Sequence, residues 1–301
     1  MDVALTGFEP EFLTEKWHLM ETGACFSVGG DAQNASVTMA YLGLNTWLSG
    51  KTGDDDVGRF CMDFCAASGV NTSRVARVSG GKTATTVNVV KKNGEAAMLT
   101  FQGENLNYRK EDVPFDLFGE ARFVSLHSFF SLPGLDYAEV LRGAKAAGAK
   151  TLADTATRRG YEKAEMIKDS FPLLDFFCPS YDEAYGLLGL KDPGDLARGF
   201  LDRGVGTVVI KLGEKGCLVA DKEGFIEVPA YACRVVNTTG AGDSFTAGFL
   251  YGLCKGYSLG GAAKCGNAAG AITAGSAATS GAVRSERQLL DFIASFGDSI
   301  S

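Results

Sequence analysis

Residues 236–245 read Val-Asn-Thr-Thr-Gly-Ala-Gly-Asp-Ser-Phe, and they join two different patterns of apolar residues. A β-rich run at 232–236 leads into the turn, and a helical pattern follows it, with Phe245, Phe249 and Leu253 spaced four apart. Glycine in such a turn permits a positive φ and a close approach of the backbone to a ligand. The free N–H groups of the turn and of the helix start would then point at one spot, which suits an anion such as a phosphate.

Asp243 lies at the start of the predicted helix, directly after the glycines. A carboxylate there is common, because it caps free N–H groups and suits the helix dipole. In a phosphate pocket it has a further task, the removal of a proton from a hydroxyl group that attacks the phosphorus. This turn alone does not distinguish a structural role of Asp243 from a catalytic one. The assignment therefore depends on motifs elsewhere in the chain.

Four motifs resemble the signatures of the ribokinase-like (PfkB) family of carbohydrate kinases. Residues 238–245 are similar to the family's Asp-Thr-x-Gly-Ala-Gly-Asp signature. The other three are Gly-Gly-Asp-Ala-Gln-Asn-Ala at 29–35, Thr-Gly-Asp-Asp-Asp-Val-Gly at 52–58 and Lys-Leu-Gly-Glu-Lys-Gly at 211–216. They occur in the family's order and at about its spacing, and together they span almost the whole chain.

The resemblance implies an α/β fold, with a Rossmann-like, doubly wound and mostly parallel sheet flanked by helices and with a small β-sheet lid. The core would comprise 29–82 and 102–301, and the lid 3–28 and 83–101. From Gly119 onward, strand-like runs alternate with helical ones, which independently favours a parallel sheet. We expect strands at 122–126, 150–153, 174–178 and 206–211, helices at 35–42, 137–147, 183–188 and 260–274, and a hairpin with an Asn-Gly turn over 83–101.

The resemblance also implies an activity, the ATP-dependent phosphorylation of a hydroxyl group of a small carbohydrate. Asp243 would be the general base, and Gly240, Ala241 and Gly242 would form the anion hole. Glu183 would order water around Mg²⁺, although Ser stands where the family has Asn three residues earlier. A glutamate at a helix start is otherwise a routine partner of the helix dipole.

Four residues correspond to the family's nucleotide contacts, and one corresponds to a ligand of a monovalent cation. The cation, usually potassium (K⁺), is held in the family by the first Asp of the signature and by loop carbonyls, here 275–281. Asn237 replaces that Asp, which removes a charge and leaves the need for K⁺ open. The nucleotide contacts are Lys211, Gly213, Gly216 and Asn267; Lys211 can equally be a solvated strand end.

The sugar-binding residues implied by the resemblance are Asp2, Gly29, Gly30, Asn34 and Arg158. The glycine pair would let the backbone approach the sugar, and Asn34 offers both a donor and an acceptor. The alternative for Asn34 is a helix N-cap. Arg158 ends an Asp-x-x-x-Arg run that is similar to the Asp-x-Asn-x-Arg of ketosugar and sugar-acid kinases, with Ala in place of Asn. A solvated arginine in a surface loop is the alternative.

Asp2 has almost no residues before it. In the family, a strand of the central sheet runs just ahead of the sugar-binding Asp. Its absence would leave a gap in that sheet and unpaired backbone groups. We therefore expect the natural N-terminus to lie upstream of Met1; the alternative is that Asp2 is a frayed terminal residue.

Composition limits the remaining function classes. A chain of 301 residues, 46% hydrophobic and 22% charged, can bury a sizeable core. The net charge of −7 disfavours a nucleic-acid or anionic membrane surface. No signal peptide and no membrane span is recognised, and eight scattered cysteines predict reduced thiols in the cytoplasm. Two histidines disfavour a His-rich zinc site, and the Gly-Lys-Thr runs at 50–52 and 81–83 lack the first glycine of a P-loop.

Two alternatives to a sugar kinase of the ribokinase or fructokinase type remain. One is a nucleoside or sugar-acid (2-keto-3-deoxygluconate) kinase of the same fold. The other is a non-catalytic regulator that binds a sugar or a nucleotide, which Ser180 and Asn237 favour and an intact Asp243 disfavours. The resemblance further implies a possible homodimer, because lid edges often pair in this family.

Overall fold

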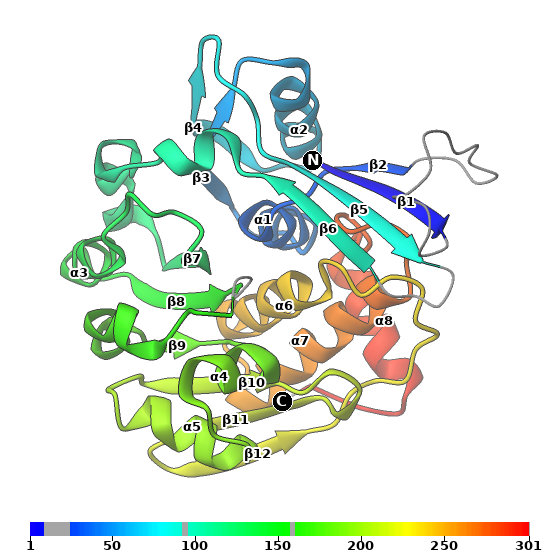
Figure 1. Cartoon of the computed structure of the whole chain (residues 1–301). Coiled ribbons are helices and arrows are strands. Elements are labelled where there is room, and N and C mark those ends of the chain that lie inside the picture. The colour runs from blue at the N-terminus through cyan, green and yellow to red at the C-terminus, as the bar shows by residue number, and fades with distance from the viewer. Residues whose placement is uncertain (9–24, 92–95, 157–159, 301) are drawn as a thin grey trace.

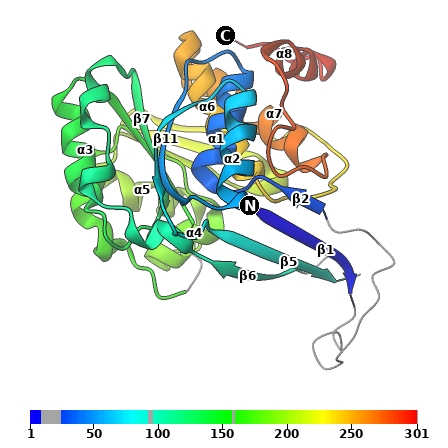
Figure 2. The same ribbon diagram turned by 90° about the horizontal axis from the view of Figure 1, so that it is seen from above.

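The structure, a computed structural model, describes residues 1–8, 25–91, 96–156 and 160–300 (Figures 1 and 2). Its strands form a six-stranded sheet, a four-stranded sheet and a two-stranded ladder. Helices pack on both faces of the six-stranded sheet, each over its own cluster of buried apolar side chains. Among the described residues, no helix has the length and apolar character needed to cross a bilayer.

The six-stranded sheet confirms the predicted alternation of strands and helices. Its first four strands along the chain run parallel, as expected for crossover connections through helices, and the last two are antiparallel. The predicted run at 174–178 forms only a two-residue strand. The strands are β7 (Phe123–Phe129), β8 (Lys150–Thr155), β9 (Phe176–Phe177), β10 (Thr207–Lys211), β11 (Cys217–Asp221) and β12 (Gly224–Val228), in the spatial order β12-β11-β10-β9-β8-β7.

Two layers of helices cover this sheet. On one face lie α3 (Tyr137–Ala146), α4 (Tyr181–Leu188) and α5 (Pro193–Leu201); on the other lie α6 (Ala241–Lys255) and α7 (Leu259–Ala274), with α8 (Glu286–Ser295) outside them. Small residues bring α6 and α7 close, because a Cβ at Gly252 would lie 2.5 Å from the Cα of Ala262. Short 3-10 helices occur at Gly103–Asn107, Lys110–Asp112, Phe115–Glu120, Ala164–Leu173 and Gly213–Lys215.

The central sheet is interrupted. β3 (Trp47–Gly53) and β4 (Asn71–Val78) form a parallel ladder of their own, and within the described ranges β3 pairs with no strand of the six-stranded sheet. α1 (Asp31–Tyr41) packs against both β3 and β7, and α2 (Asp56–Ala67) packs against β4 (Figure 1). The break lies between β3 of this ladder and β7 of the six-stranded sheet.

The four-stranded sheet is separate from the core sheet and projects from it in the view of Figure 2. It contains β1 (Asp2–Phe8), β2 (Cys25–Ser27), β5 (Thr85–Lys91) and β6 (Ala96–Phe101), in the order β2-β1-β5-β6. β5 and β6 are the arms of the predicted hairpin, with Thr85 opposite Phe101; its Asn-Gly turn lies outside the described residues. Asp2 is opposite both Ser27 and Thr86, so a frayed terminus is the wrong alternative.

One predicted strand is wrong, and so is the alternative considered for Asn34. The run at 232–236 forms no strand: Val235 and Val236 are exposed, and the Val236 N–H donates to the carbonyl of Ala274 instead of to a sheet neighbour. Asn34 is not an N-cap, because α1 already begins at Asp31. A β-branched run forms a strand only where a sheet edge is within reach, which the sequence does not reveal.

Candidate active site

The turn before α6 has the geometry that its glycines predict. Gly240 has φ 81°, and a Cβ there would lie 2.1 Å from the carbonyl oxygen of Thr279, so only glycine fits. The Ala241 N–H donates to a carbonyl of the turn. In the described part of the chain, the N–H groups of Gly242 and Asp243 have no hydrogen-bond acceptor. They remain available to an anion at the positive end of the helix.

Asp243 contacts the second predicted motif directly. Asn34 Nδ2 donates to Asp243 Oδ2 over 2.8 Å, which joins the start of α6 to α1. The residue is partly exposed, but its carboxyl group is enclosed by protein. Burial, followed by the negative charge of Asp31, raises the pKa of Asp243 well above its ordinary range, while the bond from Asn34 opposes the shift. A raised pKa brings a carboxyl group nearer to the pH at which it can accept and release protons.

Residues 29 and 30 bring the N-terminal strand to the same place. A Cβ at Gly29 would lie 2.1 Å from Asp2 Oδ2, so the carboxylate of Asp2 packs directly on the glycine backbone. Gly30 has φ 109°, a backbone conformation that favours glycine. Asn34 is 3% exposed and its Oδ1 has no hydrogen-bond partner, although its amide nitrogen is satisfied. A buried acceptor of this kind suits a ligand hydroxyl group.

Lys211 joins the end of β10 to the end of β8 by an ion pair. Its Nζ lies 2.6 Å from Asp154 Oδ2, which also accepts a hydrogen bond from Thr246 Oγ1 over 2.7 Å. A Cβ at Gly242 would lie 3.4 Å from Nζ, so the ammonium group is beside the first turn of α6. Burial lowers the pKa of Lys211, but the charges of Asp154 and Glu183 outweigh it and raise the pKa. Lys211 is therefore a buried cation, and a solvated strand end is the wrong alternative.

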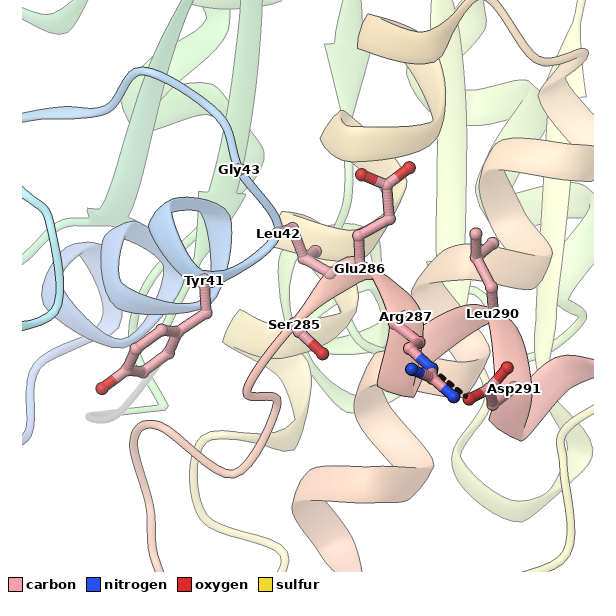
Figure 3. A pocket seen from close by; sticks show the side chains of 8 residues that line it. All are labelled: Tyr41, Leu42, Gly43, Ser285, Glu286, Arg287, Leu290 and Asp291. Atoms are coloured by element: carbon pink, nitrogen blue, oxygen red, sulfur yellow. Dashed lines mark hydrogen bonds and ion pairs between the residues drawn. The ribbon is translucent and has the colours of Figure 1, made fainter.

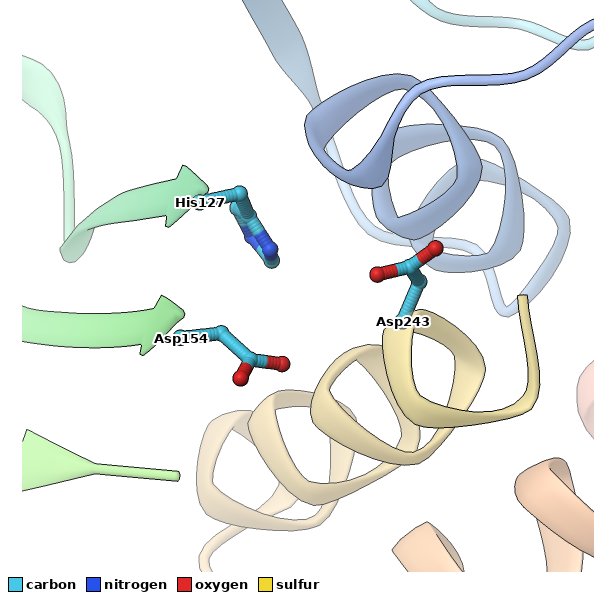
Figure 4. A group of neighbouring side chains, drawn as sticks. All are labelled: His127, Asp154 and Asp243. Atoms are coloured by element: carbon cyan, nitrogen blue, oxygen red, sulfur yellow. The ribbon is translucent and has the colours of Figure 1, made fainter. Parts of the chain in front are cut away.

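No sequence motif includes His127, which lies beside Asp243 and Asp154 in Figure 4. Its side chain is 8% exposed, and its Nε2 is 2.9 Å from Ser125 Oγ. The other ring nitrogen, Nδ1, is buried without a hydrogen-bond partner. Burial lowers the pKa of His127, so the imidazole is neutral near pH 7. The only signal in the sequence is a histidine directly after the predicted strand at 122–126.

The end of β7 is distorted where it reaches this site. Ser128 has φ 59° and Phe130 has φ 73°, values that are uncommon for residues other than glycine. The pairing register with β8 also shifts between Leu126 and Phe129. Ser128 Oγ donates to the carboxylate of Asp31 at the start of α1. Backbone strain of this kind persists only where the surroundings enforce it, and it is frequent at functional sites.

Glu183 occupies a reciprocal helix cap. Its Oε2 accepts the N–H of Ser180 over 2.8 Å, and the hydroxyl group of Ser180 accepts the N–H of Glu183 over 3.3 Å. Burial raises the pKa of Glu183, and Lys211 opposes that shift. Glu183 therefore does stabilise the start of α4, which is the structural role considered for it. Only Oε2 takes part in the cap, and the role of Glu183 in holding Mg²⁺ through water stays a prediction.

Asn237 fits a monovalent cation poorly. Its Oδ1 accepts the N–H of Thr239 over 3.0 Å, and its Nδ2 donates to the carbonyl of Ala277 over 3.3 Å. Ala277 belongs to the loop whose carbonyls would hold the ion. The amide of Asn237 therefore bonds directly to this loop. A carboxylate at this position would need a cation between its own oxygen and the carbonyl oxygen of Ala277.

The remaining predicted nucleotide contacts lie on two elements. Gly213 (φ 60°) and Gly216 (φ 95°) shape the turn after β10, beside Lys211. Asn267 of α7 is buried, and its Nδ2 donates to the carbonyls of Val228 and Pro229 over 3.0 Å each. Asn267 therefore holds the end of β12 in place, and its contact with a nucleotide stays a prediction.

Two further observations limit the site. Arg158 lies outside the described residues, so its predicted sugar contact is neither supported nor opposed. A surface hollow of about 550 Å³ lies between the end of α1 and the start of α8 (Figure 3), and it includes none of the predicted site residues. Its lining comprises Tyr41, Leu42, Gly43, Ser285, Glu286, Arg287, Leu290 and Asp291.

Comparison with known proteins gives the family. The family model described as "pfkB family carbohydrate kinase" matches residues 4–285, so the chain belongs to this family. A ribokinase from Staphylococcus aureus is 28% identical over 267 residues, which cover 86% of this chain and 85% of that protein. A 2-dehydro-3-deoxygluconokinase from Bacillus subtilis is 30% identical over 263 residues, which cover 82% and 81%. The structure of Arabidopsis thaliana ribokinase complexed with ribose and ATP matches with a TM-score of 0.84 at 20% identity, covering 97% of this chain and 95% of that one.

Family membership confirms the predicted fold and enzyme class. The chain has the α/β fold of ribokinases, and it is a carbohydrate kinase, a phosphotransferase that acts on an alcohol group. Kinases of this family use ATP and Mg²⁺, and one structural match was solved with both. The relatives differ in the sugar that they phosphorylate.

Proposed function

We propose that the protein transfers the terminal phosphoryl group of ATP to a hydroxyl group of a small neutral sugar, as ribokinases and fructokinases do. The observation that carries this proposal is the hydrogen bond between Asn34 and Asp243. It places the candidate base of α6 beside an orphan acceptor, Asn34 Oδ1, and beside the backbone of Gly29 and Gly30. A sugar hydroxyl group held by Asn34 would therefore reach Asp243.

In this proposal each residue has one task. Asp243 takes the proton of the acceptor hydroxyl group while its oxygen bonds to phosphorus, and the bond between phosphorus and the leaving ADP oxygen breaks. The N–H groups of Gly242 and Asp243, with the ammonium group of Lys211 beside them, stabilise the charge on the moving phosphoryl group. Gly240 and Ala241 shape this turn. The lid sheet would exclude water that competes with the sugar.

The bound ion and nucleotide would be held by residues at the strand ends. Mg²⁺ neutralises phosphate charge, and Glu183 would hold it through water. Gly213, Gly216 and Asn267 are the proposed nucleotide contacts. We do not include K⁺ among the required ions, because the amide of Asn237 already bonds to the carbonyl of Ala277.

The charge of the site supports a neutral acceptor over a sugar acid. Asp154 and Asp243 lie beside the proposed acceptor position, and the ammonium group of Lys211 is already bound to Asp154. The charge of a carboxylated sugar would be repelled by the carboxylate of Asp243.

The test is a measurement of ADP formation with ribose, fructose, 2-keto-3-deoxygluconate and nucleosides as separate acceptors. We expect turnover with ribose or fructose and a loss of about 10²–10⁴ in kcat for Asp243→Asn. Asp291→Asn, an acidic residue of α8, is the matched control and should keep full activity. Turnover by Asp243→Asn within a few-fold of the parent would refute the base assignment. Selective turnover of 2-keto-3-deoxygluconate or a nucleoside would replace the sugar proposed here.

We also propose a homodimer formed through the lid sheet, in the cytoplasm. Its two edge strands, β6 and β2, expose large apolar side chains: Met98 is 57%, Leu99 62%, Phe101 56% and Phe26 61% exposed. An edge strand with exposed apolar residues favours pairing with another chain. Cys61, Cys65, Cys178, Cys217, Cys233, Cys254 and Cys265 are free thiols, which supports a reducing compartment.

A further inference from the structure

Three side chains from three separate elements point toward one another: His127 at the end of β7, Asp154 near the end of β8 and Asp243 at the start of α6 (Figure 4). One ligand atom of each lies within 4.8 Å of those of the other two. We call these three residues the His127 site. The phosphoryl-transfer proposal uses Asp243 but gives His127 no task.

Each member of the His127 site keeps one atom for a ligand. His127 Nδ1 is buried and has no hydrogen-bond partner, because Ser125 contacts the other ring nitrogen. Asp243 is bonded to Asn34 only through Oδ2, which leaves Oδ1 unengaged in the described structure. Asp154 Oδ2 binds Lys211 and Thr246, whereas Oδ1 accepts one backbone N–H and retains a lone pair.

The state of the imidazole decides what these atoms attract. Burial lowers the pKa of His127, so the ring is neutral; with Nε2–H donating to Ser125, Nδ1 presents a lone pair. When Asp243 is deprotonated, the neutral imidazole and the two carboxylates are a set of acceptors without a donor. Such a set is completed by a cation, and buried orphan acceptors are otherwise costly.

We propose that the His127 site binds a divalent transition-metal ion, such as Zn²⁺ or Co²⁺, and that the bound ion inhibits the kinase by occupying Asp243. One nitrogen and two carboxylate oxygens form a donor set that suits these ions. Mg²⁺ prefers oxygen ligands and retains its water, so it competes weakly for this position. Lys211 neutralises part of the charge of Asp154, which lowers the affinity without removing any of the three ligand atoms.

The inhibition, but not the binding, rests on the proposed function. A metal-bound Asp243 cannot take the proton of the acceptor, and the ion fills the space beside Asn34 that the acceptor hydroxyl group would enter. Inhibition by the ion should therefore be competitive with the acceptor sugar and not with ATP.

The test uses Co²⁺, whose absorption distinguishes nitrogen and oxygen ligands from cysteine thiolates. The whole protein is titrated with Co²⁺ without nucleotide, and then assayed with Co²⁺ at fixed Mg²⁺ and varied ribose or fructose. His127→Gln is the main variant, because an amide near Ser125 replaces Nε2 while Nδ1 is lost. His18→Gln changes the only other histidine of the chain and is the matched control.

We expect the parent and His18→Gln to bind one Co²⁺ without thiolate absorption, and His127→Gln to bind it more than about tenfold more weakly. The inhibition constant should rise by the same factor. Ser125→Ala removes the contact with Nε2 but keeps the imidazole ring, so it should weaken Co²⁺ binding less. This variant tests the site if His127→Gln does not fold. Equal binding by the parent and by the His127 variant would overturn the site. Binding with no kinase turnover on any acceptor would uphold the site and count only against the proposed function.

Discussion

Asp31 and Asp243 lie close enough for each charge to affect the other. We predict that Asp31→Asn moves the acidic limb of the pH profile of kcat/KM to lower pH, by roughly one unit. Asp243 must be deprotonated to act as a base. Removing a neighbouring negative charge stabilises the deprotonated form and lowers the pKa. The pH profile of the variant is the measurement, with exposed Asp56→Asn as the control that should leave the limb in place. A limb that does not move would assign the profile to another group.

The ionised form of Asp243 should also destabilise the folded protein at neutral pH. Its pKa is raised in the folded protein, so its folded form holds a proton more tightly than the unfolded chain. This contribution to the free energy of unfolding is complete below the ordinary pKa of an aspartate and is lost as the pH rises through the folded pKa. Asp243→Asn should therefore raise the Tm at pH 8 relative to the parent and change it little at pH 4. A lower Tm at pH 8 would contradict the raised pKa.

Asn237 gives a prediction for monovalent ions. Because its amide bonds directly to the carbonyl of Ala277, we predict equal activity of the parent in K⁺ and in Na⁺. Asn237→Asp places two oxygen atoms face to face, so this variant should gain activation by K⁺. Asn71→Asp is a matched control, since Asn71 Oδ1 likewise accepts the N–H of the residue two positions later. Strong activation of the parent by K⁺ would refute the hypothesis that the amide of Asn237 takes the place of a bound cation.

At the scale of elements, the start of α2 is tied to the loop before the hairpin. Asp55 accepts the N–H of Gly58 and both the N–H and the hydroxyl group of Thr83. Burial raises the pKa of Asp55, but these hydrogen bonds, with Lys82 nearby, outweigh it and lower the pKa to about 2. The resulting stability is present above the ordinary pKa of an aspartate and is lost as the pH falls toward 2.

We predict that Thr83→Val lowers the free energy of unfolding by about 1–3 kcal/mol, because the buried N–H of Gly53 also loses its acceptor. The midpoint of acid unfolding should move to higher pH, since the pKa of Asp55 returns toward its ordinary value. Denaturant unfolding at pH 7 and an acid titration measure both effects. Thr100→Val, at an exposed position of β6, is the control with little expected change. Unchanged stability of Thr83→Val would show that the contact contributes nothing.

The sequence predicted elements where a local pattern and a local signal agreed. Thr207–Lys211 forms a strand and Ala241–Lys255 a helix because apolar spacing and glycine placement point the same way. The strand predicted at 232–236 does not form, because a strand also needs the edge of a sheet to pair with. β2 has only three residues, so no periodic pattern could reveal it.

For the site, the motifs predicted that Asp243, Asn34 and the glycine pair lie close together, as they do in the structure. Their catalytic and binding roles stay predictions. His127, Ser128 and Asp31 were missed as a group, because they meet only when the end of β7 reaches the start of α1, about a third of the chain away. No local pattern encodes such a contact; polar residues near the end of a strand are the one available sign.

At the scale of the whole molecule, the lid sheet should decide the oligomeric state. We predict that the parent is a dimer at micromolar concentration and that Leu99→Lys makes it a monomer, because a charge on the exposed edge strand opposes pairing. Sedimentation velocity over a range of concentrations is the measurement. Phe225→Lys, an exposed position on β12, is the control that should remain a dimer. A parent that is a monomer at every concentration would remove the dimer proposal.

The separation of β3 from β7 has a mechanical consequence. A continuous sheet resists bending because each strand is fastened to the next by a row of backbone hydrogen bonds. In the described structure these rows stop between β3 and β7, and α1 packs against both strands. Tilting α1 would change the distance between Asn34, which it carries, and the strand ends that hold Lys211 and Asp154. We therefore predict that α1 moves when the candidate active site opens to admit a sugar or to release its product.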